Sequence, residues 1–206
     1  VMKAGFVAVP LFTAFGSDGL SSRLEDCKPV LLILDPEKPE LSSSNNVETV
    51  IADPNFLKSL LKFETTFTTS ITSADMAMYQ YTSGTSRALP EAVKHHHRAI
   101  VTVMIAALYA TGVRPGDRYM CPSSPAWGHG LWHGTLAPLA LGIEISTYAG
   151  KFDPEKLLAA IEKFEITNLS AAATHYRMMR NINNPKKYSL KLKKLSFTGE
   201  PLDTET

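Results

Sequence analysis

The stretch between Tyr81 and Arg98 combines small, hydroxyl-bearing residues with a following run of cationic and histidine side chains. It begins Tyr81-Thr82-Ser83-Gly84-Thr85-Ser86 and, after Pro90, continues into Lys94-His95-His96-His97-Arg98. Backbone N–H and side-chain O–H groups of such a loop can approach an anion closely, because no bulky side chain blocks the way. On composition alone an ordinary turn is the commoner explanation. The residues therefore leave two alternatives, a turn or a grip for a nucleotide phosphate.

A second segment with the residue types of a ligand site runs from Ser123 to Trp132. It places two tryptophans and a histidine around two glycines, in the order Trp127-Gly128-His129-Gly130-Leu131-Trp132. Glycine lets the backbone pass close to a ligand, and aromatic rings supply an apolar wall of defined shape. A core turn with aromatic packing is the alternative.

A third segment, Thr198-Gly199-Glu200-Pro201, follows an apolar run that we expect to be a strand. Ligands bind at the carboxyl ends of strands in open α/β sheets, which makes the position informative. Taken alone, Gly-Glu-Pro is a weak motif and is usually only a turn.

The three adjacent histidines, His95, His96 and His97, raise the question of a metal site. Neighbouring residues of a regular backbone cannot all point at one ion, and the sequence offers no distant Cys or His pair that completes a tetrahedral set. We therefore expect no specific metal site.

The bulk properties are those of a soluble globular protein. The 206 residues suffice for one sizeable core or two sub-domains, and a net charge of +1 argues against a broad nucleic-acid surface. Cys27 and Cys121 lack metal-ligand spacing and are expected to be reduced thiols of a cytoplasmic protein. We see no targeting peptide and no apolar run of the roughly 18 residues that a membrane span requires.

The elements that must position these segments alternate along the chain. We expect strands at residues 6–9, 30–34, 47–52, 76–81, 119–122, 143–148, 166–171 and 194–197. We expect helices at residues 18–25, 54–61, 98–111, 131–141, 155–164 and 174–181. Apolar strands alternating with helices predict a doubly wound α/β fold with a largely parallel sheet covered on both faces.

Local signals fix several of these boundaries. Ser17 or Asp18 is a candidate N-cap for the first helix, and Asp153-Pro154 is a strong start signal for the helix at 155–164. The helix at 98–111 carries an apolar stripe that we expect to face the core. Its members are Ile100, Val101, Met104, Ile105 and Leu108.

The three segments, in this order, resemble the adenylate-forming (AMP-binding) superfamily of acyl-CoA synthetases, and in particular its acetyl- and medium-chain branch. The family's signature loop reads tyrosine-threonine-serine-glycine-threonine, a glycine-containing spacer, proline-lysine-glycine and a histidine-rich helix entry. The resemblance runs from Lys3-Ala4-Gly5 to Gly199-Glu200-Pro201. It implies a partial AMP-binding domain, with residues 1–73 in a first sub-domain portion and residues 74–206 carrying the phosphate loop and the acyl and adenine sites.

The signature loop departs from the family pattern at three places. One extra residue lies between Thr85 and Pro90, the spacer glycine is absent, and Glu91-Ala92 stand where lysine and glycine are usual. A carboxylate near a triphosphate is unfavourable unless it faces away or helps to hold a cation. We hypothesise that Arg87 supplies the missing positive charge.

The resemblance assigns roles to three groups of residues. The ATP phosphates are expected at Thr82, Ser83, Gly84, Thr85, Ser86 and Arg87. The acyl pocket is expected at Trp127, Gly128 and His129, and the adenine at Gly199, Glu200 and Pro201. In the same way, Ala173-Thr174 with Arg177 corresponds to the family's proline-threonine-arginine helix entry, with Ala173 in place of the proline.

The family chemistry implies an ATP-dependent acid–CoA ligase that forms AMP, with a carboxylic acid, ATP, Mg²⁺ and CoA as its small-molecule partners. The resemblance also places the catalytic lysine, a later tyrosine-glycine-threonine-glutamate motif, the ribose-binding aspartate and the C-terminal lid domain outside this chain. We therefore expect the polypeptide alone to be inactive, and its exposed sheet edges to favour association into a homo-oligomer. A non-catalytic nucleotide- or phosphate-binding module, or a fragment with only a structural role, are the alternatives.

Overall fold

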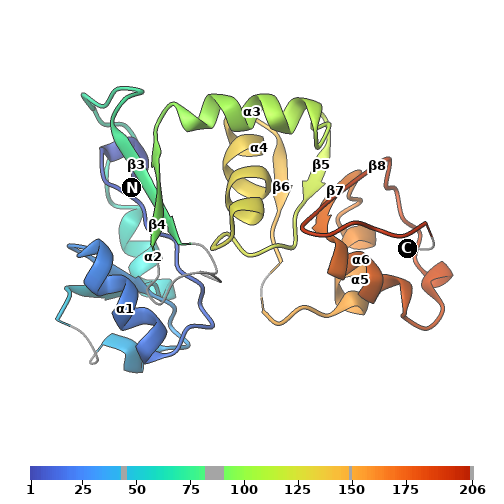
Figure 1. Ribbon diagram of the computed structural model, residues 1–206, viewed down its shortest axis with the longest axis horizontal. Helices are drawn as coiled ribbons and strands as arrows, with labels where there is room; N and C mark the ends of the chain where they lie inside the picture. The colour runs from blue at the N-terminus through green and yellow to red at the C-terminus, as the bar shows by residue number, and fades with distance from the viewer. Residues whose placement is uncertain (43–45, 82–90, 149, 205–206) are drawn as a thin grey trace. The chain divides into compact units, whose positions relative to one another are not determined.

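The computed structural model describes residues 1–42, 46–81, 91–148 and 150–204. The chain forms two compact units, Val1–His97 and Arg98–Thr206, which are described separately (Figure 1). The first unit extends to His97 because the strand that begins at Met76 pairs with the strand that ends at His96.

The first unit is built on a small core beneath helix α1 (Ser17–Cys27). Leu20 and Leu24, one turn apart on that helix, pack against Leu32 and Leu34, as the sequence pattern predicts. The N-cap is Gly16 rather than Ser17 or Asp18, since the helix begins one residue earlier than expected and has no side-chain cap. Short 3₁₀ turns cover Met2–Ala4 (η1) and Pro39–Ser42 (η2).

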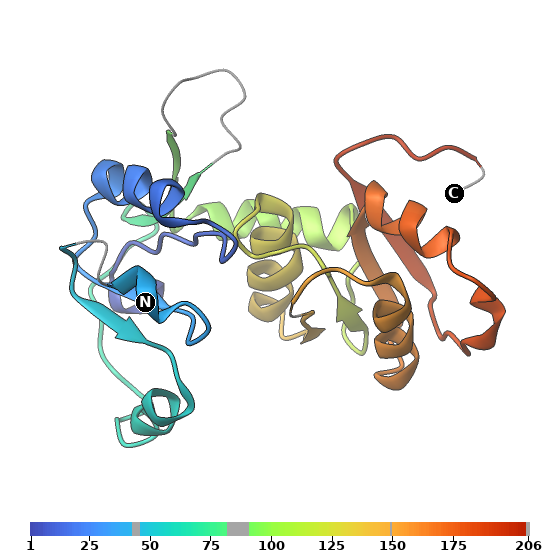
Figure 2. The ribbon, with the colours of Figure 1, turned by 90° about the horizontal axis from the view of Figure 1, so that it is seen from below.

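A two-stranded parallel pair completes this core. Strand β1 (Leu32–Leu34) pairs with β2 (Thr49–Ile51), and helix α2 (Pro54–Leu60) follows. Asp53 caps α2, its carboxylate accepting a hydrogen bond from the Phe56 N–H at 2.7 Å. In Figure 2, β2 is the cyan arrow.

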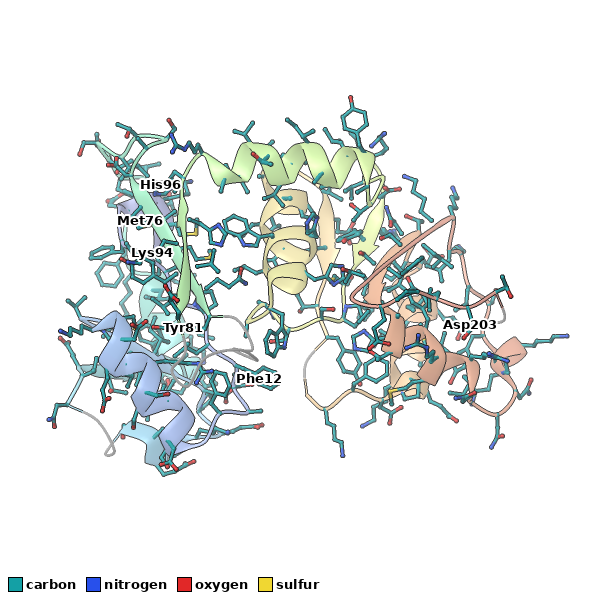
Figure 3. The ribbon with its side chains drawn as sticks, in the orientation of Figure 1. Phe12, Met76, Tyr81, Lys94, His96 and Asp203 are labelled. Atoms are coloured by element: carbon teal, nitrogen blue, oxygen red, sulfur yellow. The ribbon has the colours of Figure 1, made fainter. Side chains whose placement is uncertain are left out.

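A β-hairpin forms the rest of the first unit. Strand β3 (Met76–Tyr81) occupies the predicted residues and pairs antiparallel with β4 (Ala92–His96), which the sequence analysis did not predict. In Figure 3 Met76 and His96 lie at one end of the hairpin and Tyr81 at the other. The predicted strand at 6–9 is reduced to a single parallel bridge between Ala8 and Met78.

The second unit contains a fully parallel four-stranded sheet in the order β6-β5-β7-β8. Its strands are β5 (Arg118–Met120), β6 (Glu144–Ser146), β7 (Asn168–Ala172) and β8 (Lys194–Thr198). Its helical segments are α3 (Ala99–Tyr109), the π-helix η3 (His129–Leu136), α4 (Ala137–Ala140), α5 (Pro154–Lys163), α6 (Ala173–Arg180) and the 3₁₀ turn η4 (Pro185–Lys187).

Helices cover both faces of this sheet, which confirms the predicted doubly wound α/β fold. Successive residues of a strand point to opposite faces. Tyr119 therefore packs with Ala107 of α3 and Ala137 of α4. Met120 packs with Ile161 of α5 on the other face of the sheet. Figure 2 shows α3 and α4 on one side of the strands and α5 and α6 on the other.

The predicted apolar stripe of α3 is only partly correct. Val103, Met104 and Ala107 pack against the sheet, whereas Val101 and Ile105 are exposed. The helix is apolar on most sides, so the pattern alone could not identify the covered face. Asp153 caps α5 as predicted, accepting hydrogen bonds from the N–H groups of Glu155 and Lys156.

A polar network closes the amino-terminal edge of the sheet. The ammonium group of Lys194 donates to Asp117 at 2.7 Å and to the Gly112 carbonyl at 2.9 Å. The side-chain amide of the buried Asn168 donates to the Thr111 carbonyl at 3.1 Å. Burial acts to raise the pKa of Asp117, but hydrogen bonds from Lys194 and its other donors outweigh it and hold that pKa below the usual value.

We predict that K194M lowers the free energy of unfolding by about 1–2 kcal/mol, because it removes the main cationic partner of an Asp117 side chain that is only 11% exposed. K187M, which breaks the exposed Lys187–Glu155 pair, is the matched control and should have no measurable effect. Urea unfolding of the two variants makes the comparison. Equal stability of K194M and the unsubstituted chain would contradict the role of the network.

Candidate active site

The order of the strands places a switch point between β5 and β7. From β5 the chain moves outward to β6, then crosses back over β5 to form β7 and β8 on the other side. The connections leaving β5 and β7 therefore diverge at the carboxyl ends of these two strands. In open α/β sheets this divergence creates the crevice in which ligands bind.

His129 lies at this switch point and connects the two strands. Its Nδ1 is 3.0 Å from the hydroxyl of Ser123, which follows β5. Its Nε2 is 2.9 Å from the hydroxyl of Ser170, which belongs to β7. Both ring nitrogens thus have hydroxyl partners, and a hydroxyl can donate to one nitrogen and accept from the other. The Sγ of Cys121 is a further 3.7 Å neighbour of Nδ1.

Two glycines let the helical segment that carries His129 approach the end of β5. A Cβ at Gly130 would lie 2.3 Å from the carbonyl oxygens of Ser123 and Ser124. A Cβ at Gly134, one turn later, would lie 2.8 Å from the side chain of Cys121. The wide π-helical turn is accompanied by a 2.9 Å hydrogen bond from the Thr135 hydroxyl to the Gly130 carbonyl. The glycines are therefore required by close approach of two backbones.

Burial keeps the imidazole of His129 neutral. Loss of hydration, reinforced by the nearby His133 and His175, lowers the pKa of His129 to about 4. Burial also lowers the pKa of His133 and that of His175. The carboxyl edge of the sheet thus presents uncharged imidazoles at neutral pH, which can accept or donate hydrogen bonds but offer no positive charge.

The two tryptophans of the same segment have different environments. Trp127 is 40% exposed, whereas Trp132 is 6% exposed and belongs to the interior. The helical turn begins with the N–H of Leu131 donating to the Trp127 carbonyl at 2.9 Å, and Gly128 is the N-cap residue of η3. Trp132 therefore packs in the core, as the alternative of a core turn predicts, whereas Trp127 reaches the surface and its place in an acyl pocket stays a prediction.

His175 is a residue of this edge that the sequence analysis did not single out. It lies in the first turn of α6, directly after β7, and its ring stacks on Phe152 with centroids 4.3 Å apart. Its Nδ1 accepts a hydrogen bond from the Ala172 N–H at 3.3 Å. The signal that could have revealed it is its position after the predicted strand at 166–171, next to the switch point.

The third segment follows β8 and is held by α6. Gly199 adopts φ 94°, a conformation that favours glycine, and turns the chain after the strand. The guanidinium group of Arg177 contacts the Glu200 carboxylate at 2.5 Å and the Pro201 carbonyl at 2.8 Å. The helix-entry arginine and the Gly-Glu-Pro segment, more than 20 residues apart along the chain, thus meet directly.

The phosphate-loop residues, Thr82 to Arg87, lie outside the described residues, but the start of the loop is anchored. The hydroxyl of Tyr81 donates to the Asp26 carboxylate at 2.5 Å. Burial, reinforced by this hydrogen bond, raises the pKa of Tyr81. The guanidinium group of Arg23 lies over the rings of Phe15 and Tyr81, at 4.0 and 5.6 Å from their centroids. Tyr81 is thereby fixed against α1.

The described residues contain neither a cluster of metal ligands nor a membrane-spanning helix. In residues 1–42, 46–81, 91–148 and 150–204, no three His, Cys, Asp or Glu side chains are grouped as a metal ion would require. The same parts of the chain contain no helix that is both long and apolar enough to cross a membrane.

Comparison with protein families decides the identity of this fold. The model of the family described as AMP-binding enzyme matches residues 1–206. The chain belongs to the AMP-binding enzyme family. Its resemblance to acyl-CoA synthetases, inferred from the three sequence segments, is thereby confirmed.

Individual AMP-binding relatives are matched along the whole chain. The acetyl-coenzyme A synthetase of Bacillus subtilis (strain 168) is 26% identical over 99% of this chain and 38% of its own length. The 4-hydroxybutyrate–CoA ligase 1 of Metallosphaera sedula is 26% identical over 100% of this chain and 38% of its own length. The chain therefore spans about two fifths of these relatives.

Solved structures show the same fold. A Brucella canis acyl-CoA synthetase superposes with a TM-score of 0.84 at 24% identity, covering 96% of this chain and 39% of that one. The anthranilate CoA ligase AuaEII in complex with anthranoyl-AMP gives a TM-score of 0.85 at 19% identity, covering 95% and 41%. At these identities the likeness concerns the fold alone.

We predict that G130A destabilises the second unit by about 2–4 kcal/mol, because the added methyl group would overlap two backbone carbonyls that cannot both move away. Chemical unfolding followed by tryptophan fluorescence compares G130A with the unsubstituted chain, because Trp127 and Trp132 both belong to the second unit. Wild-type stability of G130A would contradict the close approach.

We also predict that the second unit loses stability as the pH falls from about 6.5 towards 4. An unfolded histidine binds a proton with a pKa of about 6.5, whereas the buried His129 does so only near 4. Between these two pH values the unfolded state therefore binds more protons than the folded state. The free energy of unfolding decreases as the pH is lowered through this range and is constant above about pH 6.5. H129Q should make this dependence shallower in urea titrations at pH 7.5, 6 and 5. An equally steep dependence in H129Q would show that His129 does not titrate as described.

Proposed function

We propose that this chain is part of an AMP-forming acid–CoA ligase. The observation that carries the proposal is the match of an AMP-binding family model to residues 1–206, with relatives aligned end to end that are named acetyl-CoA synthetase and 4-hydroxybutyrate–CoA ligase. The placement of His129 and the Gly199–Pro201 segment after parallel strands β5 and β8 supports it.

The proposed reaction has two steps. A substrate carboxylate attacks the α-phosphorus of ATP, giving an acyl-adenylate and releasing pyrophosphate. The thiol of CoA then attacks the acyl carbonyl, forming a thioester and releasing AMP. Mg²⁺ enters with ATP, since this ion is bound largely through substrate phosphates rather than by an all-protein cage. It offsets the negative charge of the triphosphate.

The residues would divide these tasks among three places. Thr82, Ser83, Gly84, Thr85 and Ser86 would surround the phosphates with N–H and O–H donors, and Arg87 would add positive charge. Trp127, Gly128 and His129 would receive the acyl group, and Gly199, Glu200 and Pro201 would contact the adenine. The neutral, hydroxyl-bound imidazole of His129 suits an uncharged acyl chain better than it suits a phosphate.

We further propose a cytoplasmic location, because Cys27 and Cys121 are both free thiols, as expected in a reducing compartment.

Calorimetric titration tests the function with two ligands, ATP–Mg²⁺ and a non-hydrolysable acyl-adenylate analogue. An acid–CoA ligase site should bind the acyl-adenylate at least about tenfold more tightly, because that ligand engages the acyl and adenine residues together. Binding of neither ligand would contradict the proposal.

A non-catalytic nucleotide-binding module is the second candidate. It is favoured by Glu91 and Ala92, which stand where the family loop has lysine and glycine. Such a module would bind ATP–Mg²⁺ and an acyl-adenylate with equal affinity, since it would draw no benefit from the acyl group.

We predict that W127A weakens binding of the acyl-adenylate analogue by about tenfold and leaves ATP–Mg²⁺ binding unchanged, because only the acyl group would contact the indole. The 40% exposure of Trp127 makes its loss tolerable for folding. W132A is unsuitable as a binding variant, because Trp132 is 6% exposed and its truncation would leave a cavity in the interior. If W127A weakened the binding of both ligands equally, Trp127 would not be a residue of the acyl pocket.

A further inference from the structure

The chain segment after β8 is held in place by one arginine of α6. Residues 199–203 form no helix or strand. Arg177 contacts two consecutive residues of this segment, donating from one terminal nitrogen to the Glu200 carboxylate at 2.5 Å and from the other to the Pro201 carbonyl at 2.8 Å. One turn further along α6, Arg180 lies 3.8 Å from Asp203, which is labelled beside the carboxyl-terminal end in Figure 3.

The helix that presents Arg177 is itself fixed to the sheet. The hydroxyl of Tyr176, the preceding residue, lies 2.8 Å from the Ser196 carbonyl of β8 and 3.1 Å from the Leu169 carbonyl of β7. Met179 packs in the core beneath the same helix. Arg177 therefore extends from a rigid support, and its contacts fix the segment relative to strands β7 and β8.

Global stability does not explain this arrangement. The side chains of Arg177 and Glu200 are 37% and 56% exposed, and exposed ion pairs contribute little to folding. What the guanidinium group supplies is geometry, because its planar fork engages a side chain and a neighbouring backbone carbonyl at once. Together with φ 94° at Gly199 and the fixed φ of Pro201, it restricts the segment to a narrow set of conformations.

We propose that Arg177 is a positioning residue for the nucleotide base, acting through Glu200 and Pro201. The inference rests on the proposed function, which places the adenine against Gly199, Glu200 and Pro201. A base that stacks on this segment or bonds to its backbone finds it already ordered, so that less conformational entropy is lost on binding. Pairing with Arg177 also neutralises Glu200, whose carboxylate would otherwise oppose an anionic nucleotide.

The test compares R177A and R177K with R118A. Arg118 forms an ion pair of the same type with Glu165, at 2.6 Å and similar exposure, but at the start of β5. Hydrogen exchange of residues 199–204 is measured in each 206-residue variant, and the affinities for ATP–Mg²⁺, a non-hydrolysable acyl-adenylate and inorganic tripolyphosphate are determined by calorimetry. Tripolyphosphate lacks the base and reports on the phosphate loop alone.

We expect faster exchange of residues 199–204 in R177A, about tenfold weaker binding of both adenine-containing ligands, and unchanged tripolyphosphate binding. R177K should fall between R177A and the unsubstituted chain, since lysine keeps the charge but not the fork. R118A should match the unsubstituted chain throughout.

Unchanged hydrogen exchange in R177A would show that Arg177 does not order the segment after β8. Faster exchange with unchanged affinity for the acyl-adenylate would show that this ordering plays no part in binding the base. Equal weakening of tripolyphosphate binding would also overturn a role in binding the base, because the effect would then be one of charge. Failure of the unsubstituted chain to bind any of the nucleotides would instead overturn the proposed function, while the exchange data would still decide whether Arg177 orders the segment.

Discussion

The imidazole of His129 connects the two strands on which the second unit depends. Its ring nitrogens contact the hydroxyl of Ser123, which follows β5, and the hydroxyl of Ser170 within β7. These two neighbouring strands flank the point at which the order of strand addition reverses. This connection requires a bare backbone at Gly130 and Gly134, because a side chain at either position would collide with the end of β5. The buried imidazole thus lies where the π-helical turn, the two closely packed glycines and the candidate acyl residues meet.

Local signals predicted the elements that depend on local physics. The Asp153-Pro154 pair fixed the start of α5, and strand β3 occupies the predicted residues 76–81. Elements that depend on distant partners were harder to predict. The strand β4 exists because residues 92–96 pair with β3, whereas their basic and histidine side chains give no strand pattern. The covered face of α3 was misjudged because the sheet, rather than the helix, selects it.

The candidate site divides in the same way. Trp127 and His129 could be found from residue type and spacing, and the Gly-Glu-Pro segment from its position after a strand. Their partners could not, since Ser170 lies 41 residues from His129 and Arg177 lies 23 residues from Glu200 along the chain. These contacts form only once parallel strands bring the carboxyl ends of β5, β7 and β8 to one edge. The family match adds the chemistry that the geometry alone does not specify.

The most direct test of a ligand site at the switch point is an NMR titration of the His129 imidazole with and without a non-hydrolysable acyl-adenylate. A desolvated ring between Ser123 and Ser170 should have a pKa of about 4 and therefore stay neutral at higher pH. Its ¹⁵N resonances should shift when the ligand binds. A pKa near the ordinary value of about 6.5, together with resonances that do not respond to the ligand, would contradict both the buried connection and the site built around it.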